Sequence, residues 1–356
     1  MAETGFVFLD LPVTDKNSEH SVDYAVLNFM VDSFLEKGGR YFDTSHTEEA
    51  IKESLVKRHK RDSFILADKL PSWMIRKKED CYSIFEKQLS RCGTDFFDIY
   101  FLQWINEENY ISAEMTGEFD FIEEMKSSGK VKETGFSFFG TPELLDKILS
   151  KHPEIDYVQL QINYLDFESP AFRSKECCEV AKKHGKKIIA AEFSKSGNLL
   201  KIPQKLFGIS FEEAFHLAFG FIKNLPEVEF VLLEFKSADE IERAFKETSP
   251  LSAEEISFAE KIAKAIRLEK SISCNGCGLC KKSCPLQIPI PEYFEIYNEQ
   301  NRFPEESWKI NHVYSNLTRS YSRPSDCLRC RLCESICPEK INIVEALKIV
   351  SRTFGY

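Results

Sequence analysis

Two cysteine runs near the end of the chain have the clearest chemical meaning. Both follow the spacing C-x2-C-x2-C-x3-C-P, which wraps one loop round three corners of a [4Fe-4S] cluster and leaves the fourth thiolate to reach a second cluster. A zinc ribbon uses paired C-x2-C elements and has no need of the third and fourth cysteines. We therefore expect two [4Fe-4S] clusters. The predicted ligands are Cys274, Cys277, Cys280 and Cys284 in the first run, and Cys327, Cys330, Cys333 and Cys337 in the second.

The spacing favours crossed ligation, in which each run gives its last cysteine to the other cluster. One cluster then takes Cys337 with the first three cysteines of the first run, and the other takes Cys284 with the first three of the second run. The alternative, in which each run serves its own cluster, stays open. Residues 285–326 separate the runs and have a helical pattern, so this part of the chain resembles the α-helical type of ferredoxin.

Composition sets limits on the class of protein. The chain has 356 residues, 43% of them hydrophobic and 29% charged, with a formal net charge of −10. This acidic balance disfavours a nucleic-acid partner, and no stretch reaches the ~18 apolar residues of a membrane span. Twelve cysteines without a secretory leader predict a cytoplasmic protein with free thiols. Four of them lie in helical patterns and are expected to be ordinary buried thiols: Cys81, Cys92, Cys177 and Cys178.

Eight short apolar runs alternate with amphipathic segments before residue 267. Strand and helix alternating eight times predict a (β/α)8 TIM barrel. An open doubly wound sheet is the second choice, weakened because no G-x-G-x-x-G follows the first strand. The expected strands are Phe6–Leu9, Arg40–Asp43, Phe64–Lys69, Phe97–Gln103, Val131–Ser137, Tyr157–Gln161, Lys187–Ala191 and Glu229–Leu233.

A boundary between two domains is expected at the end of the barrel. Ser252 and Glu255 form a capping-box pattern in front of a helix over Ala253–Leu268. We predict a barrel over residues 1–267 and a small, mainly α-helical ferredoxin domain over 268–356. Only five residues separate that helix from Cys274, so the second domain is expected to dock on the barrel.

Several segments in a fixed order resemble the aldo/keto reductase family. They read GGRYFDTSHTEEAIKESL, FILADKLPSW, FFDIYFLQW, GKVKETGFSFFGTPELLDKIL and DYVQLQINYLDFE, and the ferredoxin tail resembles that of the family's iron-sulfur subgroup. The resemblance implies a nicotinamide-dependent carbonyl reductase with its site at the carboxyl ends of the strands. In that mechanism a tyrosine donates a proton, a lysine and an aspartate lower its pKa, and a histidine orients the substrate.

Only half of this catalytic set is present. Asp43 and Lys69 match the aspartate and the lysine, while the tyrosine has no counterpart and Gln103 stands in the place of the histidine. His46 is a candidate replacement for the proton donor, with an ordinary polar loop residue as the alternative. Gln103 and the following Trp104 are candidates for binding a substrate, and a leftover structural ion pair is the alternative for Asp43 and Lys69.

The resemblance also implies positions for a nicotinamide cofactor. Ser137 and Gln159 match residues that hydrogen-bond the carboxamide, and Lys236 and Ser237 fall near the loop that grips a 2′-phosphate. Glu240 stands where an arginine would be useful, so NADPH preference is not supported and NADH or no nicotinamide is favoured. Glu192 and Lys195 follow a pattern of the iron-sulfur subgroup, E-P-x-K-G-G, only loosely.

The cluster ligands are all present, whereas the residues for hydride transfer are incomplete. This contrast favours an iron-sulfur oxidoreductase whose clusters supply electrons. NAD(P)H stays a candidate cofactor, a small molecule the expected substrate, and a redox protein a candidate partner. Two alternatives are an NAD(P)H-dependent carbonyl reductase with rebuilt acid catalysis and a non-enzymatic electron-transfer or scaffold protein. Delivery of electrons within the chain requires the ferredoxin domain to dock at the barrel mouth that holds Lys69 and Gln103.

Overall fold

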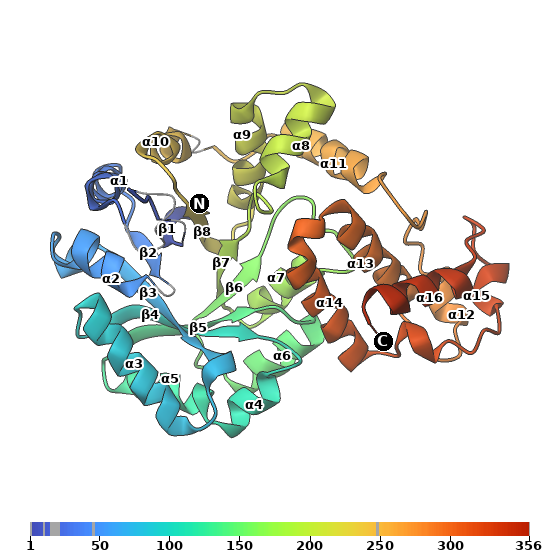
Figure 1. The fold of residues 1–356 in the computed structure, drawn as a ribbon, viewed down its shortest axis with the longest axis horizontal. Helices are drawn as coiled ribbons and strands as arrows, with labels where there is room; N and C mark the ends of the chain where they lie inside the picture. Colours follow the sequence, from blue (N-terminus) through green and yellow to red (C-terminus); the bar gives the residue numbers. More distant parts are fainter. Residues whose placement is uncertain (1, 10, 15–21, 45–46, 247–248, 356) are drawn as a thin grey trace.

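A computed structural model of the protein describes residues 2–9, 11–14, 22–44, 47–246 and 249–355. Eight parallel strands form a closed barrel in chain order (Figure 1), and β1 pairs with both β2 and β8. The predicted (β/α)8 TIM barrel is confirmed. The strands are β1 (Glu3–Phe8), β2 (Tyr41–Thr44), β3 (Ile65–Pro71), β4 (Phe97–Ile105), β5 (Val131–Phe138), β6 (Tyr157–Gln161), β7 (Lys187–Ala191) and β8 (Val228–Glu234).

Helices connect the strands and cover the outside of the barrel. The α-helices are α1 (Tyr24–Glu36), α2 (Glu48–Ile51), α3 (Lys78–Cys92), α4 (Tyr110–Met115), α5 (Glu118–Ser127), α6 (Pro142–Lys151), α7 (Ser174–Lys183), α8 (Asn198–Phe207), α9 (Phe211–Lys223), α10 (Ala238–Lys246) and α11 (Ala253–Arg267). Short helical turns are the π-helix η1 (Lys52–Val56) and the 3-10 turns η2 (Arg61–Ser63) and η3 (Ser72–Met74).

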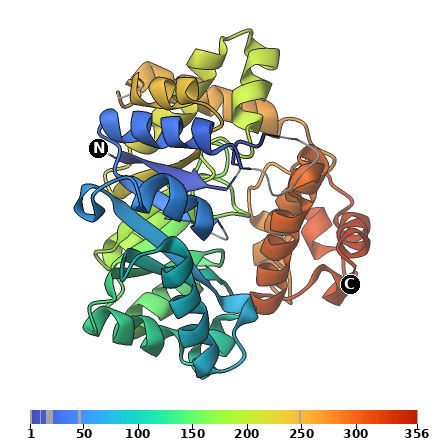
Figure 2. The ribbon, with the colours of Figure 1, turned by 60° about the vertical axis from the view of Figure 1, so that its left-hand side comes forward.

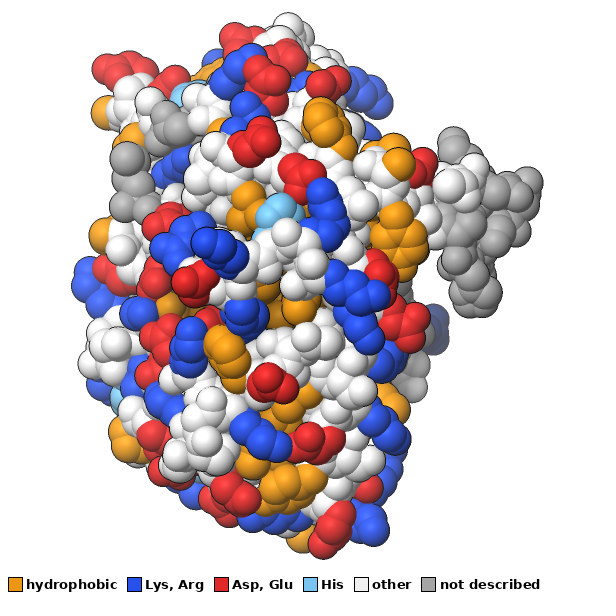
Figure 3. Space-filling model, turned by 90° about the vertical axis from the view of Figure 1, so that its left-hand side faces the viewer, with side chains coloured by type: hydrophobic (Ala, Val, Ile, Leu, Met, Phe, Trp, Pro, Cys, Tyr) orange, Lys and Arg blue, Asp and Glu red, His pale blue; other side chains and the backbone are white. Residues whose placement is uncertain are grey.

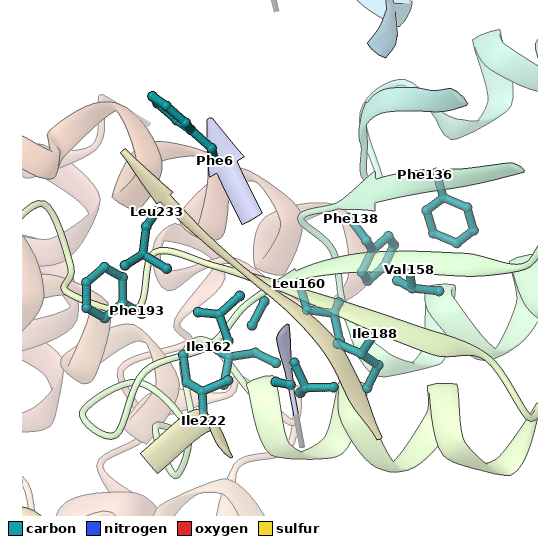
Figure 4. Close-up of a cluster of buried hydrophobic side chains, with 14 of the residues drawn as sticks. Phe6, Phe136, Phe138, Val158, Leu160, Ile162, Ile188, Phe193, Ile222 and Leu233 are labelled. Carbon is teal, nitrogen blue, oxygen red and sulfur yellow. The ribbon is translucent and has the colours of Figure 1, made fainter. Parts of the chain in front are cut away.

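The apolar core of the barrel has two parts, one outside and one inside the ring of strands. A large shell of buried side chains lies between the strands and the surrounding helices. Figure 4 shows a part of this shell, where residues such as Leu160, Ile188 and Leu233 gather. A smaller layer fills the barrel interior and includes Tyr41 and Phe101. Successive residues of a strand point to opposite faces, so the residue two positions after each interior residue also points inward.

After α11 the chain is helical. It forms α12 (Leu279–Ser283), α13 (Ile290–Arg302), η4 (Pro304–Glu306), α14 (Ser307–Ser320), η5 (Pro324–Asp326), α15 (Leu332–Ser335) and α16 (Ile343–Thr353). Figure 2 shows these orange and red helices against the end of the barrel toward which the strand arrows point. A core cluster of their own includes Tyr293, Ile310 and Leu347. The predicted helical character of the C-terminal region is confirmed.

The local predictions differ from the structure mainly at the ends of elements. The first strand begins at Glu3, because Glu3 and Thr4 pair with β8, and it ends at Phe8, before the exposed Leu9. Pro203 lies inside α8, and a proline there argues against a helix in the sequence. The capping box of Ser252 and Glu255 is present at the start of α11.

Figure 3 shows the face on the side of α1 and α2, where basic and acidic side chains alternate without a large area of one sign. Every helix in the described part of the chain is too short or too polar to span a bilayer. The four cysteines of the helical patterns are buried, as expected: Cys81, Cys92, Cys177 and Cys178.

Candidate functional site

Asp43 and Lys69 form a buried ion pair at the carboxyl end of the barrel. Their places in β2 and β3 follow interior residues Tyr41 and Ala67 by two positions, so both side chains point inward. Lys69 Nζ donates to Asp43 Oδ1, and the two side chains are only 6% and 1% exposed. The pair therefore keeps a cation at the barrel mouth, above an apolar layer.

Tyr41 lies beside this pair but does not replace the missing tyrosine. Its hydroxyl donates to Asp43 Oδ2 at 3.2 Å, and the side chain is fully buried. Burial raises the pKa of Tyr41 well above its ordinary value, and the Asp43 carboxylate adds to this effect. A proton donor to a substrate needs a lower pKa and access to the mouth. The predicted donor, His46, lies outside the described residues.

Gln103 and Trp104 lie at the end of β4. Gln103 pairs with Pro71 of β3, so it belongs to the same rim as Lys69. Trp104 has a left-handed backbone, with φ of 69°, and its N–H donates to Ser137 Oγ at 2.8 Å. This turn directs the indole away from the strand and toward the C-terminal helices.

Two of the four predicted nicotinamide positions lie side by side. Ser137 of β5 and Gln159 of β6 are partners in register. Ser137 Oγ accepts the Trp104 N–H, and its own proton can still be donated. Gln159 Oε1 is buried and accepts no hydrogen bond from any described residue. This acceptor fits a ligand N–H.

The loop after β8 already has an acidic partner. Glu240 Oε2 accepts the backbone N–H of Lys236 at 2.7 Å, and Ser237 Oγ accepts the N–H of Glu240 at 3.3 Å. Lys236 and Ser237 thus lie together just before α10. The carboxylate of Glu240 occupies the backbone donor that an anion would use, and it repels a phosphate.

The eight cysteines of the two runs separate into two groups, each round its own cavity. The thiols of each group surround a space, and no group of three or more His, Cys, Asp or Glu side chains in the described ranges is arranged to hold a single metal ion. The first cavity is lined by Cys274, Cys277, Cys280 and Cys337, and the second by Cys284, Cys327, Cys330 and Cys333. This is the grouping that crossed ligation requires.

The two runs also share a backbone conformation. Gly276 and Arg329, each two residues after the first cysteine of a run, both have positive φ, at 76° and 58°. The same is true of Gly278 and Arg331, which follow the second cysteine, at 71° and 60°. Such a left-handed turn is unusual for arginine. Its repetition indicates that each loop is shaped around the same kind of group.

The donor set of each cavity fits an iron-sulfur cluster. Soft thiolates select iron-sulfur clusters over hard cations. The first cavity has apolar walls that include Phe294 and Ile343, and the second has Ile288 and Leu347. Burial and the neighbouring thiol Cys274 raise the pKa of Cys280 to about 12, so this thiol ionises near neutral pH only with positive charge beside it.

The C-terminal helices are seated on the loops that follow the barrel strands. The indole of Trp104, after β4, stacks on Trp308 of α14 with ring centroids 5.1 Å apart and an angle of 15°. Asn316 of α14 donates to the carbonyl oxygen of Phe139, after β5. The ferredoxin helices therefore cover the same mouth at which Lys69 and Gln103 lie.

A buried charge network joins the two parts of the chain. Lys195, after β7, is 2% exposed, and its Nζ lies 2.8 Å from Asp166 Oδ2, after β6. The same ammonium lies 3.6 Å from Glu299 Oε2 of α13 and 3.6 Å from Glu306 Oε2 of η4. One barrel lysine thus binds carboxylates from both parts of the chain.

Two further cations complete the network. Lys309 Nζ of α14 lies 2.6 Å from Glu192 Oε2 and 3.7 Å from Glu306 Oε1. Arg302 Nη1 lies 2.6 Å from Glu299 Oε1. The sequence pattern identified Glu192 and Lys195 but not their partners, because no local signal connects residues more than one hundred positions apart.

Glu299 has an unusual proton affinity in this setting. Burial raises the pKa of its carboxyl from 4.5 to about 7, and the nearby Asp166 adds to the rise. Lys195 and Arg302 oppose the effect without cancelling it. Burial therefore makes Glu299 a weaker acid than usual at the seam between the barrel and the C-terminal helices.

Comparisons with known proteins agree with both parts of the fold. The model described as "Aldo/keto reductase family" matches residues 14–207, and the model described as "4Fe-4S dicluster domain" matches residues 273–341. No curated protein matches the chain.

Solved structures of aldo/keto reductases resemble the barrel. The holo form of an enzyme from Bacillus halodurans is 22% identical, with a TM-score of 0.59, and the match covers 74% of this chain and 92% of that one. An enzyme from Klebsiella pneumoniae in complex with NADP and acetate is 17% identical, with a TM-score of 0.57, over 73% of this chain and 90% of that one. At such identities the likeness is one of fold.

Proposed function

The chain belongs to the aldo/keto reductase family, and on that premise we propose that it is an iron-sulfur oxidoreductase in which two [4Fe-4S] clusters supply electrons to a small-molecule substrate. We assign residues 1–267 to the barrel and 268–356 to the ferredoxin domain. The observation that carries the proposal is the seating of α14 on the barrel mouth through Trp104 and Trp308. That contact supports delivery of electrons within the chain, which needs the ferredoxin domain at the mouth of Lys69 and Gln103.

The cysteines of the first cavity would hold one cluster, and those of the second cavity the other. The two groups support crossed ligation, because Cys284 lines the cavity of the second run and Cys337 that of the first. The backbone N–H of Gly276 donates to Cys274 Sγ at 3.4 Å, a contact that stabilises a thiolate.

The barrel would bind and polarise the substrate. The Lys69 ammonium can stabilise negative charge that develops on a substrate oxygen, and Asp43 fixes its position. Gln103, on the same rim, is a candidate for a hydrogen bond to the substrate, and His46 remains a candidate proton donor. The covering α14 would keep bulk water from this mouth.

Hydride transfer in the manner of the family is not favoured. The tyrosine is missing, and Tyr41 is a weaker acid than usual because of its burial. Transfer of single electrons does not need a proton donor that acts together with an arriving hydride. Reduction by NAD(P)H with rebuilt acid catalysis is therefore the second candidate, and one observation favours it.

That observation is the unmatched Gln159 Oε1 beside Ser137, which suits the carboxamide N–H of a nicotinamide. Glu240 at the phosphate loop favours NADH over NADPH. We propose a redox protein as the electron partner, and the cytoplasm as the location, since reducing compartments keep such thiols available as ligands.

An anaerobic titration tests the two candidates together. Protein purified without oxygen should contain about eight iron and eight sulfide per chain, as two [4Fe-4S] clusters require. Dithionite should bleach its broad visible absorbance, while NADH and NADPH should leave it unchanged. Bleaching by NADH at the rate of substrate turnover would favour the nicotinamide candidate, and stoichiometric zinc would refute both cluster assignments.

A further inference from the structure

The two cysteine loops can be compared position by position, because they share one backbone conformation. The first loop reads CNGCGLC and the second CLRCRLC, with positive φ at both glycines of the first and both arginines of the second. Glycine adopts this conformation without steric cost, whereas the Cβ atom of an arginine makes it unfavourable. The second loop thus carries two arginines against the local preference of its backbone, and the reason for them lies in their side chains.

Both arginine side chains lie at the surface beside the second cysteine cavity. Arg331 lines that cavity, and its side chain is 67% exposed. Arg329 is exposed and directly precedes Cys330, which is exposed as well. Arg331 Nε lies 3.8 Å from Glu334 Oε2, and so long and open an ion pair is weak. Both guanidinium groups therefore present their charge to the solvent.

Helix α16 adds two further cations to this surface. Lys348 Nζ lies 2.9 Å from Glu345 Oε1. The hydrogen bond from Lys348, together with the charges of Arg329 and Arg352, lowers the pKa of Glu345, so these side chains are neighbours across the loop and the helix. Helix α16 also packs on η5, which adds one charge of each sign. These two charges are Arg323 and Asp326.

We call this surface the arginine face, and it is positive on an acidic chain. It carries four cations and two carboxylates, while the formal net charge of the chain is −10. A local field of this sign attracts and orients an anionic partner, which the rest of the chain repels. The charged residues of the arginine face are Arg329, Arg331, Glu334, Glu345, Lys348 and Arg352.

Exposed apolar side chains lie among these charges. Leu328 and Leu332 flank the two arginines, and they are 64% and 51% exposed. Leu328 also lines the second cavity. Arginine and apolar side chains together are typical of surfaces that bind proteins. A small anion would engage the arginines alone, whereas a protein surface covers the leucines as well, so the composition favours a protein partner.

The first loop offers no such surface. It has no charged residue between its first and third cysteines, and Asn275 Nδ2 donates to the exposed acid Glu339 at 2.9 Å. The second loop is also well placed for an outside partner, since α13 and α14 lie between the barrel and α15 (Figure 1). A partner can therefore reach the second loop without displacing the barrel.

We propose that the arginine face docks an acidic electron-carrier protein, which passes single electrons to the cluster of the second cavity. In each step the carrier loses one electron and the cluster gains one, and no covalent bond forms or breaks. The inference rests on the iron-sulfur function proposed above, and it adds the charge of the redox partner and the loop that it contacts.

Binding of cytochrome b5, an acidic haem protein, to the full-length holoprotein tests the docking. With both proteins oxidised no electron passes, and broadening of the amide NMR signals of isotope-labelled cytochrome b5 reports the contact itself. The broadening should be present at low salt and absent in about 0.5 M NaCl, because salt screens exposed charges. No broadening at low salt by a protein whose visible absorbance dithionite bleaches would overturn the docking and leave the iron-sulfur function standing.

Two matched variants locate the contact. Arg329→Glu should weaken the binding of cytochrome b5 by about tenfold. Lys340→Glu should leave it unchanged, because Lys340 is an equally exposed base with positive φ (51°, against 58° at Arg329) that follows Cys337 of the first cavity. Equal weakening by both changes would show attraction to the overall charge only, and would overturn the proposal.

Electron transfer separates docking from an effect on the cluster. Dithionite-reduced protein, freed of excess reductant, is mixed with oxidised cytochrome b5 or with the basic cytochrome c. Arg329→Glu should slow the reduction of cytochrome b5 by about tenfold without slowing that of cytochrome c. A change by the same factor with both cytochromes would show that Arg329 acts on the potential of the cluster, and the docking role would be wrong.

Discussion

Glu299→Gln is the most informative change at the seam between the two domains. Glu299 lies within the buried network of Lys195, Arg302 and Asp166, and burial raises its pKa to about 7. Glutamine has the shape of the protonated acid and cannot ionise. The variant should therefore keep the acid form of the seam at every pH.

The magnitude follows from the two pKa values of the carboxyl. The unfolded or undocked group ionises near 4.5 and the docked group near 7, so the docked state binds the proton more tightly. The stabilisation that protonated Glu299 gives the docked state is complete below about pH 4.5 and is lost as the pH rises through 7. At ~1.4 kcal/mol per pH unit between the two values, the loss amounts to about 3 kcal/mol.

Hydrogen exchange of the backbone amides of α13 measures this directly. After correction for the intrinsic pH dependence of exchange, opening of α13 in the unaltered protein should become roughly a hundredfold more favourable between pH 5 and pH 8. In Glu299→Gln the opening should be nearly independent of pH. Glu305→Gln, which changes an exposed acid beside the network, is the matched control and should behave as the unaltered protein does.

The decisive comparison is the slope of opening against pH. If Glu299→Gln retained the slope of the unaltered protein, another group would be responsible, and the proton exchange assigned to Glu299 would be wrong. A slope as flat in Glu305→Gln as in Glu299→Gln would likewise show that the effect does not belong to Glu299 in particular.

Three further predictions concern the clusters and the barrel mouth. Cys284→Ser should remove the EPR signal of the cluster held by the second run and spare the other, and the opposite pattern would show that each run serves its own cluster. Lys69→Met should lower the free energy of unfolding by about 3–5 kcal/mol, because the Asp43 carboxylate is left buried without its partner, and the double variant with Asp43→Asn should recover most of this in denaturant titrations. Steady-state reduction of common aldehydes by NAD(P)H should be ~10²–10⁴-fold below that of an enzyme with the tyrosine, and turnover on the usual scale of ~1–10³ per second would refute the loss of acid catalysis.

The sequence was sufficient for features that depend on neighbours along the chain. Apolar periodicity located all eight strands, and β6 and β7 have the predicted bounds. Cysteine spacing identified the two runs, and the resemblance to the aldo/keto reductases indicated that Asp43 and Lys69, each at a strand end, share the mouth. A strand's alternation of faces and a loop's grip on a cluster are local properties, so a pattern of a few residues encodes them.

Only the tertiary structure decided which distant residues meet. Cys337 lines the cavity of the first run, Trp308 stacks on Trp104, and Lys195 binds Glu299. Each of these contacts joins segments far apart in sequence. The type of a side chain does not determine its partner, because docking of two surfaces could bring it against many different residues. The docking itself depends on the fit of two whole surfaces. For that reason the sequence could require an interface between the barrel and the ferredoxin domain, but its position over the mouth and its charge network follow from the fold.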